Sequence, residues 1–291
     1  MNDNYFLYCI KQILRYLPDN LYLRIKYRFI FGKSLNLKSP TSYNEKLQWL
    51  KLYDRRPEYE LMVDKLQVKS LVCKKIGSQH VIPTLGYWNT PEEIEWDTLP
   101  DKFVLKTTHG GGNEGVIVCH NKKKFDRQKG VSILKRSLKQ DLYKVSREWP
   151  YKGGKRRILA EKYMEDQYGE LRDYKFFCFN GVVKALFVAT GRQNRVEPFF
   201  NFFDHNYEPL PIRQGHPINP IIPPKPETFE QMKQIASNLS EGIPHVRVDL
   251  YEVNGTVFFG EYTFYHFGGT VPFEPVEWDD IFGSWLHLPV E

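Results

Sequence analysis

The 291-residue sequence lacks several features that would place it in a secreted, membrane-spanning or nucleic-acid-binding class. Its four cysteines lie far apart with no CxxC pair, which argues against structural zinc and a disulfide framework and favours a reducing, cytoplasmic setting. No apolar run reaches roughly 18 residues, and the N-terminus lacks the basic start and cleavage site of a secretory signal. A net charge of +6 is small for a dedicated nucleic-acid binder but suits anionic substrates.

Two common catalytic patterns are also missing. The Gly-Lys-Ser/Thr order of a Walker A loop does not occur, although a glycine-rich stretch is present. None of the serines or cysteines lies in a motif typical of a covalent nucleophile. Any chemistry is therefore expected from acidic and basic side chains arranged around a bound substrate.

Residues 245–263 carry the clearest pattern of such side chains. Apolar and polar residues alternate over 246–251, Asn254-Gly255 offers a turn, and a second apolar run follows. This pattern predicts a β-hairpin. Because alternate residues share a face and the two arms pair across the turn, one face is expected to gather Arg247, Asp249, Tyr251, Glu261 and Thr263.

Two carboxylates and a hydroxyl would converge beside a guanidinium on this face. Mg²⁺ uses one or two protein carboxylates and takes its remaining ligands from water and phosphate. The cluster therefore predicts a site for a metal-nucleotide complex, with Asp249, Glu261 and Thr263 as the candidate oxygen ligands. A solvated polar hairpin face accounts for the same residues equally well at this stage.

The second informative stretch is a buried strand, a glycine-rich turn and a returning strand over residues 103–118. Glycines have no Cβ, so their backbone amides can close on phosphate oxygens. Lys106, at the end of the first strand, would add a positive charge for the same phosphates. A glycine hairpin without a ligand is the alternative. The turn contains Gly110, Gly111 and Gly112.

Between these two stretches lie a predicted strand at 157–166 and a hairpin opened by residues 173–181. On the hairpin, Lys175 would be a second phosphate cation and Asp173 its partner or a nucleotide contact. A surface ion pair is the competing explanation and would contribute little energy. The order of the segments places the 157–166 strand between the glycine-rich turn and the predicted metal hairpin.

The first hundred residues are predicted to be mainly helical. Residues 5–31 begin as a basic amphipathic helix that is broken near Pro18. Such a helix either lies on an anionic membrane surface or, as we weight more heavily, packs on the domain. Ser42 and Glu45 form a capping box at the start of a second helix. A third helix is predicted over 57–76, with Gly77 as its stop.

Arg-x-Asp, a hairpin, and Glu-x-Thr followed by glycine resemble the metal-binding end of ATP-grasp enzymes. The resemblance implies that Asp249, Glu261 and Thr263 hold Mg²⁺ and that Arg247 faces an acyl-phosphate intermediate. Thr263 departs from the asparagine that is usual in the family. By the same resemblance, Lys106 and the glycines hold the ATP phosphates. The predicted adenine edge consists of Glu161, Lys162, Tyr163 and Met164.

Residues 41–54 and Val63-Asp64-Lys65 narrow the resemblance to the TupA-like branch of that family. The resemblance implies an α+β, ATP-grasp fold in which two α+β subdomains sandwich ATP, with a helical N-terminal extension. We expect a helical region at 1–99, a small subdomain with the glycine-rich loop at 100–164, and a large subdomain with the metal site at 165–291.

The function implied by the family is ATP-dependent ligation of a carboxylate to an amine through an acyl-phosphate. The expected substrates are a uronic acid or similar carboxylate and an amino acid, in the synthesis of bacterial surface polysaccharide. One alternative is a glycosyltransferase, whose metal-dependent form needs an Asp-x-Asp motif that this sequence lacks. Another is a non-catalytic glycan-binding protein with a degenerate nucleotide site. The expected location is the cytoplasm, with peripheral contact at the inner face of the membrane through the N-terminal helix.

Overall fold

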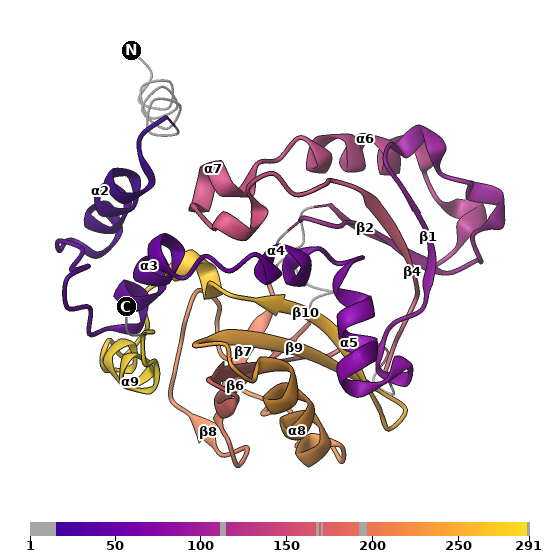
Figure 1. The fold of residues 1–291 in the computed structure, drawn as a ribbon. Coiled ribbons are helices and arrows are strands. Elements are labelled where there is room, and N and C mark those ends of the chain that lie inside the picture. The colour runs from indigo at the N-terminus through magenta and orange to yellow at the C-terminus, as the bar shows by residue number, and fades with distance from the viewer. Residues whose placement is uncertain (1–15, 111–114, 167–168, 170, 192–196, 290–291) are drawn as a thin grey trace.

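A computed structural model describes residues 16–110, 115–166, 169, 171–191 and 197–289. Its two antiparallel sheets confirm the α+β class predicted from the sequence. Figure 1 shows four layers, in the order helix α6 (Arg127–Leu138), a four-stranded sheet, a six-stranded sheet and helix α8 (Phe229–Ser240). This arrangement puts one face of each sheet toward the other.

The four-stranded sheet has the strand order β1-β4-β2-β3. Its outer face packs on α6 (Arg127–Leu138) through a small apolar core that includes Phe103, Leu105 and Leu134. Alternation then turns Lys106 and Glu161 to the inner face. The strands are β1 (Thr84–Trp88), β2 (Phe103–Thr107), β3 (Val116–Cys119) and β4 (Ile158–Lys162).

The six-stranded sheet has the strand order β10-β9-β5-β6-β7-β8. One face packs on α8 (Phe229–Ser240), where the ring of Phe176 lies 6.1 Å from that of Phe229. The strands are β5 (Asp173–Phe179), β6 (Val182–Thr190), β7 (Phe199–Asp204), β8 (Pro209–Leu210), β9 (Val246–Val253) and β10 (Thr256–Thr263).

The two central hairpins turn where the sequence predicts. Asn180-Gly181 joins β5 to β6, and Asn254-Gly255 joins β9 to β10. All four residues have positive φ, between 48° and 83°. This is the conformation that two-residue hairpin turns require and that Asn-Gly adopts readily.

Most of the remaining helices lie at one end and one side of the two sheets, and α2 lies farther out beside α3 (Figure 1). Helix α3 packs against the C-terminal α9, and the hydroxyl of Tyr43 in α3 bonds to the ring of His245 at 2.8 Å. These helices are α2 (Asp19–Phe31), α3 (Tyr43–Tyr53), α4 (Glu58–Val63), α5 (Val68–Ile76), α7 (Leu142–Ser146) and α9 (Glu277–Trp285). Short 3₁₀ turns are at Ser78–His80, Pro91–Glu93, Trp96–Thr98, Lys122–Lys124, Trp149–Tyr151 and His266–Gly269.

The predicted helix over 57–76 is wrong in one respect that matters for the site. It is interrupted between α4 and α5, where the carboxylate of Asp64 accepts hydrogen bonds from the backbone N–H groups of Leu66 and Gln67. The chain resumes as α5 and ends at Gly77, as expected. The interruption releases Lys65 from the helical surface so that its side chain can reach the six-stranded sheet.

Two further expectations for the N-terminal region have definite outcomes. Ser42 caps α3 as predicted, whereas the carboxylate of Glu45 instead accepts from the N–H groups of Asn36 and Thr41. The basic helix expected from residue 5 falls largely on residues 1–15, outside the described residues. Within the described ranges, the structure contains no helix with the length and apolarity that a membrane span requires.

Candidate active site

The β9–β10 hairpin brings its two acids together as the sequence predicts. Asp249 lies opposite Glu261, and Arg247 lies opposite Thr263. This pairing depends on a β-bulge, because the register shifts by one residue between Phe259 and Glu261. Without that shift Gly260 would oppose Asp249, and Glu261 would turn to the face that packs on α8.

Gly260 is the residue that permits the bulge. A Cβ there would lie 2.8 Å from the ring of Tyr251 and 3.1 Å from the backbone oxygen of Asp249. Any larger side chain would push the two strands apart at the point where they bulge. The bulge thus places both acids on the face directed toward the four-stranded sheet.

Strand β5 adds an acid and a base next to this pair. Lys175 lies opposite Asp249, and Asp173 lies opposite Tyr251. The ammonium of Lys175 contacts the carboxylates of Asp249 and, at 2.6 Å, Asp173. The side chains of Lys175 and Asp173 are 9% and 1% exposed, so this is a buried ion pair and not the surface pair considered from the sequence.

Arg247 is held by three partners. Its Nε and Nη2 donate to the two carboxylate oxygens of Asp249 at 2.7 and 2.8 Å. Nη2 also donates to the hydroxyl of Thr263 at 2.9 Å, and Nη1 donates to Nδ1 of His266 at 2.6 Å. Burial alone would lower the pKa of Arg247, but Asp249 outweighs it and raises the pKa, so the guanidinium stays charged.

Lys65 connects the hairpin to the glycine-rich turn. Its ammonium lies 3.1 Å from the carboxylate of Glu261 and donates to the backbone oxygen of Gly110. Burial would raise the pKa of Glu261, but the cations Lys65, Lys175 and Arg247 lower it to about 2. Glu261 is therefore ionised at neutral pH.

Lys65 is a residue that the sequence-based site omitted. It lies in the Val63-Asp64-Lys65 segment that carries the family resemblance. The continuous helix predicted there gave no indication that its side chain would reach the six-stranded sheet. Gly110 is in the described part of the chain, whereas the predicted phosphate contacts Gly111 and Gly112 lie outside the described residues.

On the facing sheet, Lys106 pairs with Glu161 and not with the hairpin acids. The two side chains lie 2.6 Å apart, and Lys69 of α5 reaches the other oxygen of Glu161, also at 2.6 Å. Burial would raise the pKa of Glu161, but Lys106 and Lys69 lower it. Lys65 and Lys69 are four residues apart, so a single segment contacts an acid on each sheet.

Three of the four residues predicted to form the adenine edge line a cavity of about 590 Å³, whereas Glu161 does not. Lys162, Tyr163 and Met164 contribute to it, together with Val253 and Asn254 from the turn of the metal hairpin. Both sheets therefore form its wall, and its size lies in the range of small-molecule sites. The assignment of adenine to this cavity stays a prediction.

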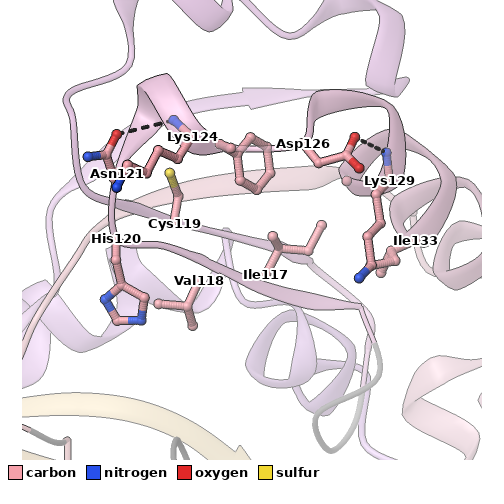
Figure 2. A pocket seen from close by; sticks show the side chains of 11 residues that line it. Ile117, Val118, Cys119, His120, Asn121, Lys124, Asp126, Lys129 and Ile133 are labelled. Carbon is pink, nitrogen blue, oxygen red and sulfur yellow. Dashed lines mark hydrogen bonds between the residues drawn. The ribbon is translucent and has the colours of Figure 1, made fainter.

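A second cavity, of about 400 Å³, lies between β3 and α6. Figure 2 shows Val118 and His120 pointing to one side of the strand and Ile117 and Cys119 to the other. Asp126 caps α6 at its rim by accepting from the N–H of Lys129. It contains none of the residues predicted for the active site.

The donor set suits a divalent cation that arrives with phosphate. Within the described ranges, no cluster of three or more His, Cys, Asp and Glu side chains could hold a metal. Asp249 and Glu261 supply two facing carboxylates, and one or two carboxylates are what proteins usually supply to Mg²⁺. Thr263 is already engaged, since its hydroxyl accepts from Arg247. Arg247 also engages both carboxylate oxygens of Asp249, but the negative charge of a carboxylate suits Mg²⁺ better than the neutral hydroxyl does.

Several solved structures overlap with part of this chain at low similarity. D-alanine–D-alanine ligase from Bacillus anthracis is 17% identical over 70% of this chain and 57% of its own, with a TM-score of 0.41. L-amino acid ligase from Bacillus licheniformis is 15% identical over 84% and 55%, with a TM-score of 0.45. The biotin carboxylase domain of Hydrogenobacter thermophilus 2-oxoglutarate carboxylase, in complex with MgADP, is 16% identical over 70% and 40%, with a TM-score of 0.39.

This chain therefore spans little more than half the length of the two ligases. A search of the curated proteins found no match. The family assignment rests on a different comparison. The model of the family described as TupA-like ATPgrasp matches residues 45–287, which include both sheets and the acid hairpin. The chain belongs to the TupA-like ATP-grasp family.

Proposed function

We propose that this protein is an ATP-dependent carboxylate–amine ligase. Membership of the ATP-grasp family supports ATP-dependent ligase chemistry. The observation that carries the proposal is the pair of facing acids, Asp249 and Glu261, on the inner face of the six-stranded sheet. Around them lie the cations Lys65, Lys175 and Arg247. A site that binds a polyphosphate with its metal needs such cations to stabilise the negative charge of the phosphates.

Among the described side chains around the acid pair, the charges balance before any ligand binds. The acids Asp173, Asp249 and Glu261 are matched by the cations Lys65, Lys175 and Arg247. Mg²⁺ held by Asp249 and Glu261 would neutralise phosphate charge and so supply electrostatic stabilisation of phosphoryl transfer. The displaced ammonium groups of Lys65 and Lys175 would then be available to phosphate oxygens.

In the proposed reaction a substrate carboxylate attacks the γ-phosphoryl group and ADP leaves. An amine then attacks the resulting acyl-phosphate, inorganic phosphate leaves, and an amide bond forms. Lys106 and the amides of the glycine-rich turn would hold the phosphates from the other sheet. Arg247, fixed on the six-stranded sheet, would stabilise the negative charge that develops on the acyl oxygens.

The substrate assignment rests on the family resemblance. We propose that the carboxylate belongs to a uronic acid or a similar group and that the amine belongs to an amino acid, in the synthesis of bacterial surface polysaccharide. Release of ADP in the presence of both compounds supports the ligase. Release of a nucleoside diphosphate from a nucleotide sugar would support a glycosyltransferase, and glycan binding without ATP turnover would support a binding protein.

We also propose that the protein acts in the cytoplasm and contacts the inner membrane face through its N-terminal region. In the described part of this region, helix α2 exposes Leu21 and Phe29, which are 46% and 82% accessible. Arg24 and Arg28 lie on the same side of the helix because they are three and seven residues from Leu21. Apolar and basic side chains on one surface are what an anionic lipid surface attracts.

The nucleotide site is tested by thermal stabilisation with Mg·ATP. Saturating ligand should stabilise the wild-type protein by about 2 to 4 kcal/mol, and Asp249→Ala and Glu261→Ala should each abolish most of this gain. Glu252→Gln is the matched control, because Glu252 lies on β9 but alternation turns it to the other face. Full stabilisation of both alanine variants would rule out this position for the nucleotide.

A further inference from the structure

We propose that His266 and Gln214 are positioning residues that hold the guanidinium of Arg247 in place during turnover. This inference rests on the proposed function, because it concerns the residue that would stabilise the reacting acyl group. Neither residue was singled out from the sequence. Gln214 lies 52 positions before His266 in the chain, so only the fold brings the pair together.

The hydrogen-bond donors determine which ring nitrogen of His266 carries the proton. A guanidinium can only donate, so Nδ1 of His266 must accept from Nη1 of Arg247 at 2.6 Å. In the neutral ring Nε2 then carries the hydrogen and donates to Oε1 of Gln214 at 3.0 Å. The amide of Gln214 is itself fixed, since its Nε2 donates to the backbone oxygen of Val271 at 3.0 Å.

The ring has no freedom to turn over. His266 and Gln214 are each 1% exposed. The imidazole lies 4.9 Å from the ring of Phe177 in an edge-on contact and 5.4 Å from that of Phe187. The pKa of His266 lies well below its usual range because burial and then Arg247 disfavour the imidazolium. A neutral acceptor therefore faces the guanidinium.

Helix α3 fixes the segment that carries the ring. Phe267 and Gly268 have positive φ, and Gln48 donates to the backbone oxygens of Gly268 and Gly269. Lys51 also donates to the oxygen of Gly268, at 2.6 Å. Gly269 also has positive φ, and a Cβ there would lie 2.4 Å from Nε2 of Gln48 and 3.0 Å from Cβ of Leu47, so this position favours glycine. The 266–269 segment is thereby bound to a rigid element.

The need for His266 follows from the other partners of Arg247. Asp249 and Thr263 are both predicted metal ligands, and Asp249 would turn toward a cation when a metal–nucleotide complex binds. The third partner, His266, does not belong to that set. It can keep Nη1 in place while the bonds to Asp249 are exchanged. We therefore expect His266 to matter for kcat more than for nucleotide affinity.

A matched pair of variants separates positioning from packing. Asn places its Oδ1 near the position of Nδ1, so His266→Asn retains an acceptor for Arg247. His266→Leu has a similar branched shape but no acceptor. With Mg·ATP, glucuronic acid and L-alanine as the probes, His266→Leu should lower kcat for ADP release about tenfold to hundredfold, because it leaves a buried charged donor unpaired. The dissociation constant for Mg·ATP should change less than about twofold, and His266→Asn should recover most of kcat.

Equal losses of kcat in the two variants, or a parallel loss of Mg·ATP affinity, would show that His266 only supports the fold.

A second measurement does not depend on turnover. Nitrogen NMR of the wild-type protein labelled at histidine should show His266 neutral, with Nε2 protonated and Nδ1 bare. A proton on Nδ1 would overturn the proposal even if the enzyme is active. If the tautomer is as expected but no uronate supports the release of ADP from ATP, the positioning of Arg247 is retained and the proposed reaction is rejected.

Discussion

The ion pair between Arg247 and Asp249 offers the sharpest test of the site, because it can be measured without any ligand. The guanidinium donates two parallel bonds of 2.7 and 2.8 Å to a carboxylate that is fully buried. Asp249→Asn keeps the shape of the side chain and removes its charge. Arg247→Met keeps much of the apolar stem and removes the guanidinium. The double variant completes a thermodynamic cycle.

The expected magnitudes follow from burial. Asp249→Asn leaves the buried guanidinium without its carboxylate, which should cost about 3 to 5 kcal/mol of unfolding free energy, whereas Arg247→Met leaves Asp249 in contact with Lys175 and should cost less. The double variant removes both charges, so neither is left buried without the other. Lys175 still faces position 249. We therefore expect the loss in the double variant to be smaller than the sum of the single losses by about 2 to 3 kcal/mol.

The assay is equilibrium denaturation of the four proteins in guanidinium chloride at pH 7, without nucleotide or magnesium. A coupling energy below about 0.5 kcal/mol would refute the reasoning. Such a value would mean that water replaces either partner at little cost. The face between the sheets would then be wet, and the strong electrostatic effect proposed for Arg247 would not be available.

Two further predictions concern the fold around the site. Gly283→Ala should destabilise the protein by about 2 to 3 kcal/mol, because the new Cβ would lie 2.2 Å from the backbone oxygen of Thr41. The control Ser284→Ala, at the neighbouring residue, should change the free energy of unfolding by less than about 0.5 kcal/mol. Equal effects of the two variants in denaturation would contradict the tight contact of α9 with α3. Burial is the main cause that lowers the pKa of His109 to about 4 and that of His245 to about 3. Both rings stay neutral in the folded protein, whereas the unfolded chain takes up protons below about pH 6.5. The free energy of unfolding should therefore fall by at least about 2 kcal/mol between pH 6 and pH 5. An unchanged free energy of unfolding over that interval would be inconsistent with two buried neutral rings.

Much of the local structure could be predicted from the sequence because it depends on neighbouring residues. The two Asn-Gly turns formed where expected, since each pair adopts positive φ at little cost. Alternation correctly placed Arg247 and Asp249 on one face of β9, with Asp173 and Lys175 on the matching face of β5. The cap of Ser42 on α3 also follows from short-range hydrogen bonding.

The acid pair shows where such reasoning stops. The pairing of Glu261 with Asp249 was expected, but a regular two-residue hairpin would have placed Gly260 there. The bulge arises because Gly260 can approach Tyr251 closely, which depends on the packing of both strands. A glycine inside a predicted strand was the one available signal.

The sequence by itself determined which side chains carry the charge, the turns that fold their strands, and the family to which the chain belongs. Only the tertiary structure decided which charges meet. Lys65 reaches Glu261 because Asp64 interrupts a helix, Lys106 pairs with Glu161 across neighbouring strands, and Gln214 fixes the ring that holds Arg247. These contacts join distant parts of the chain, and burial makes each of them obligatory, since a charged or polar group removed from water must find a partner wherever the fold supplies one.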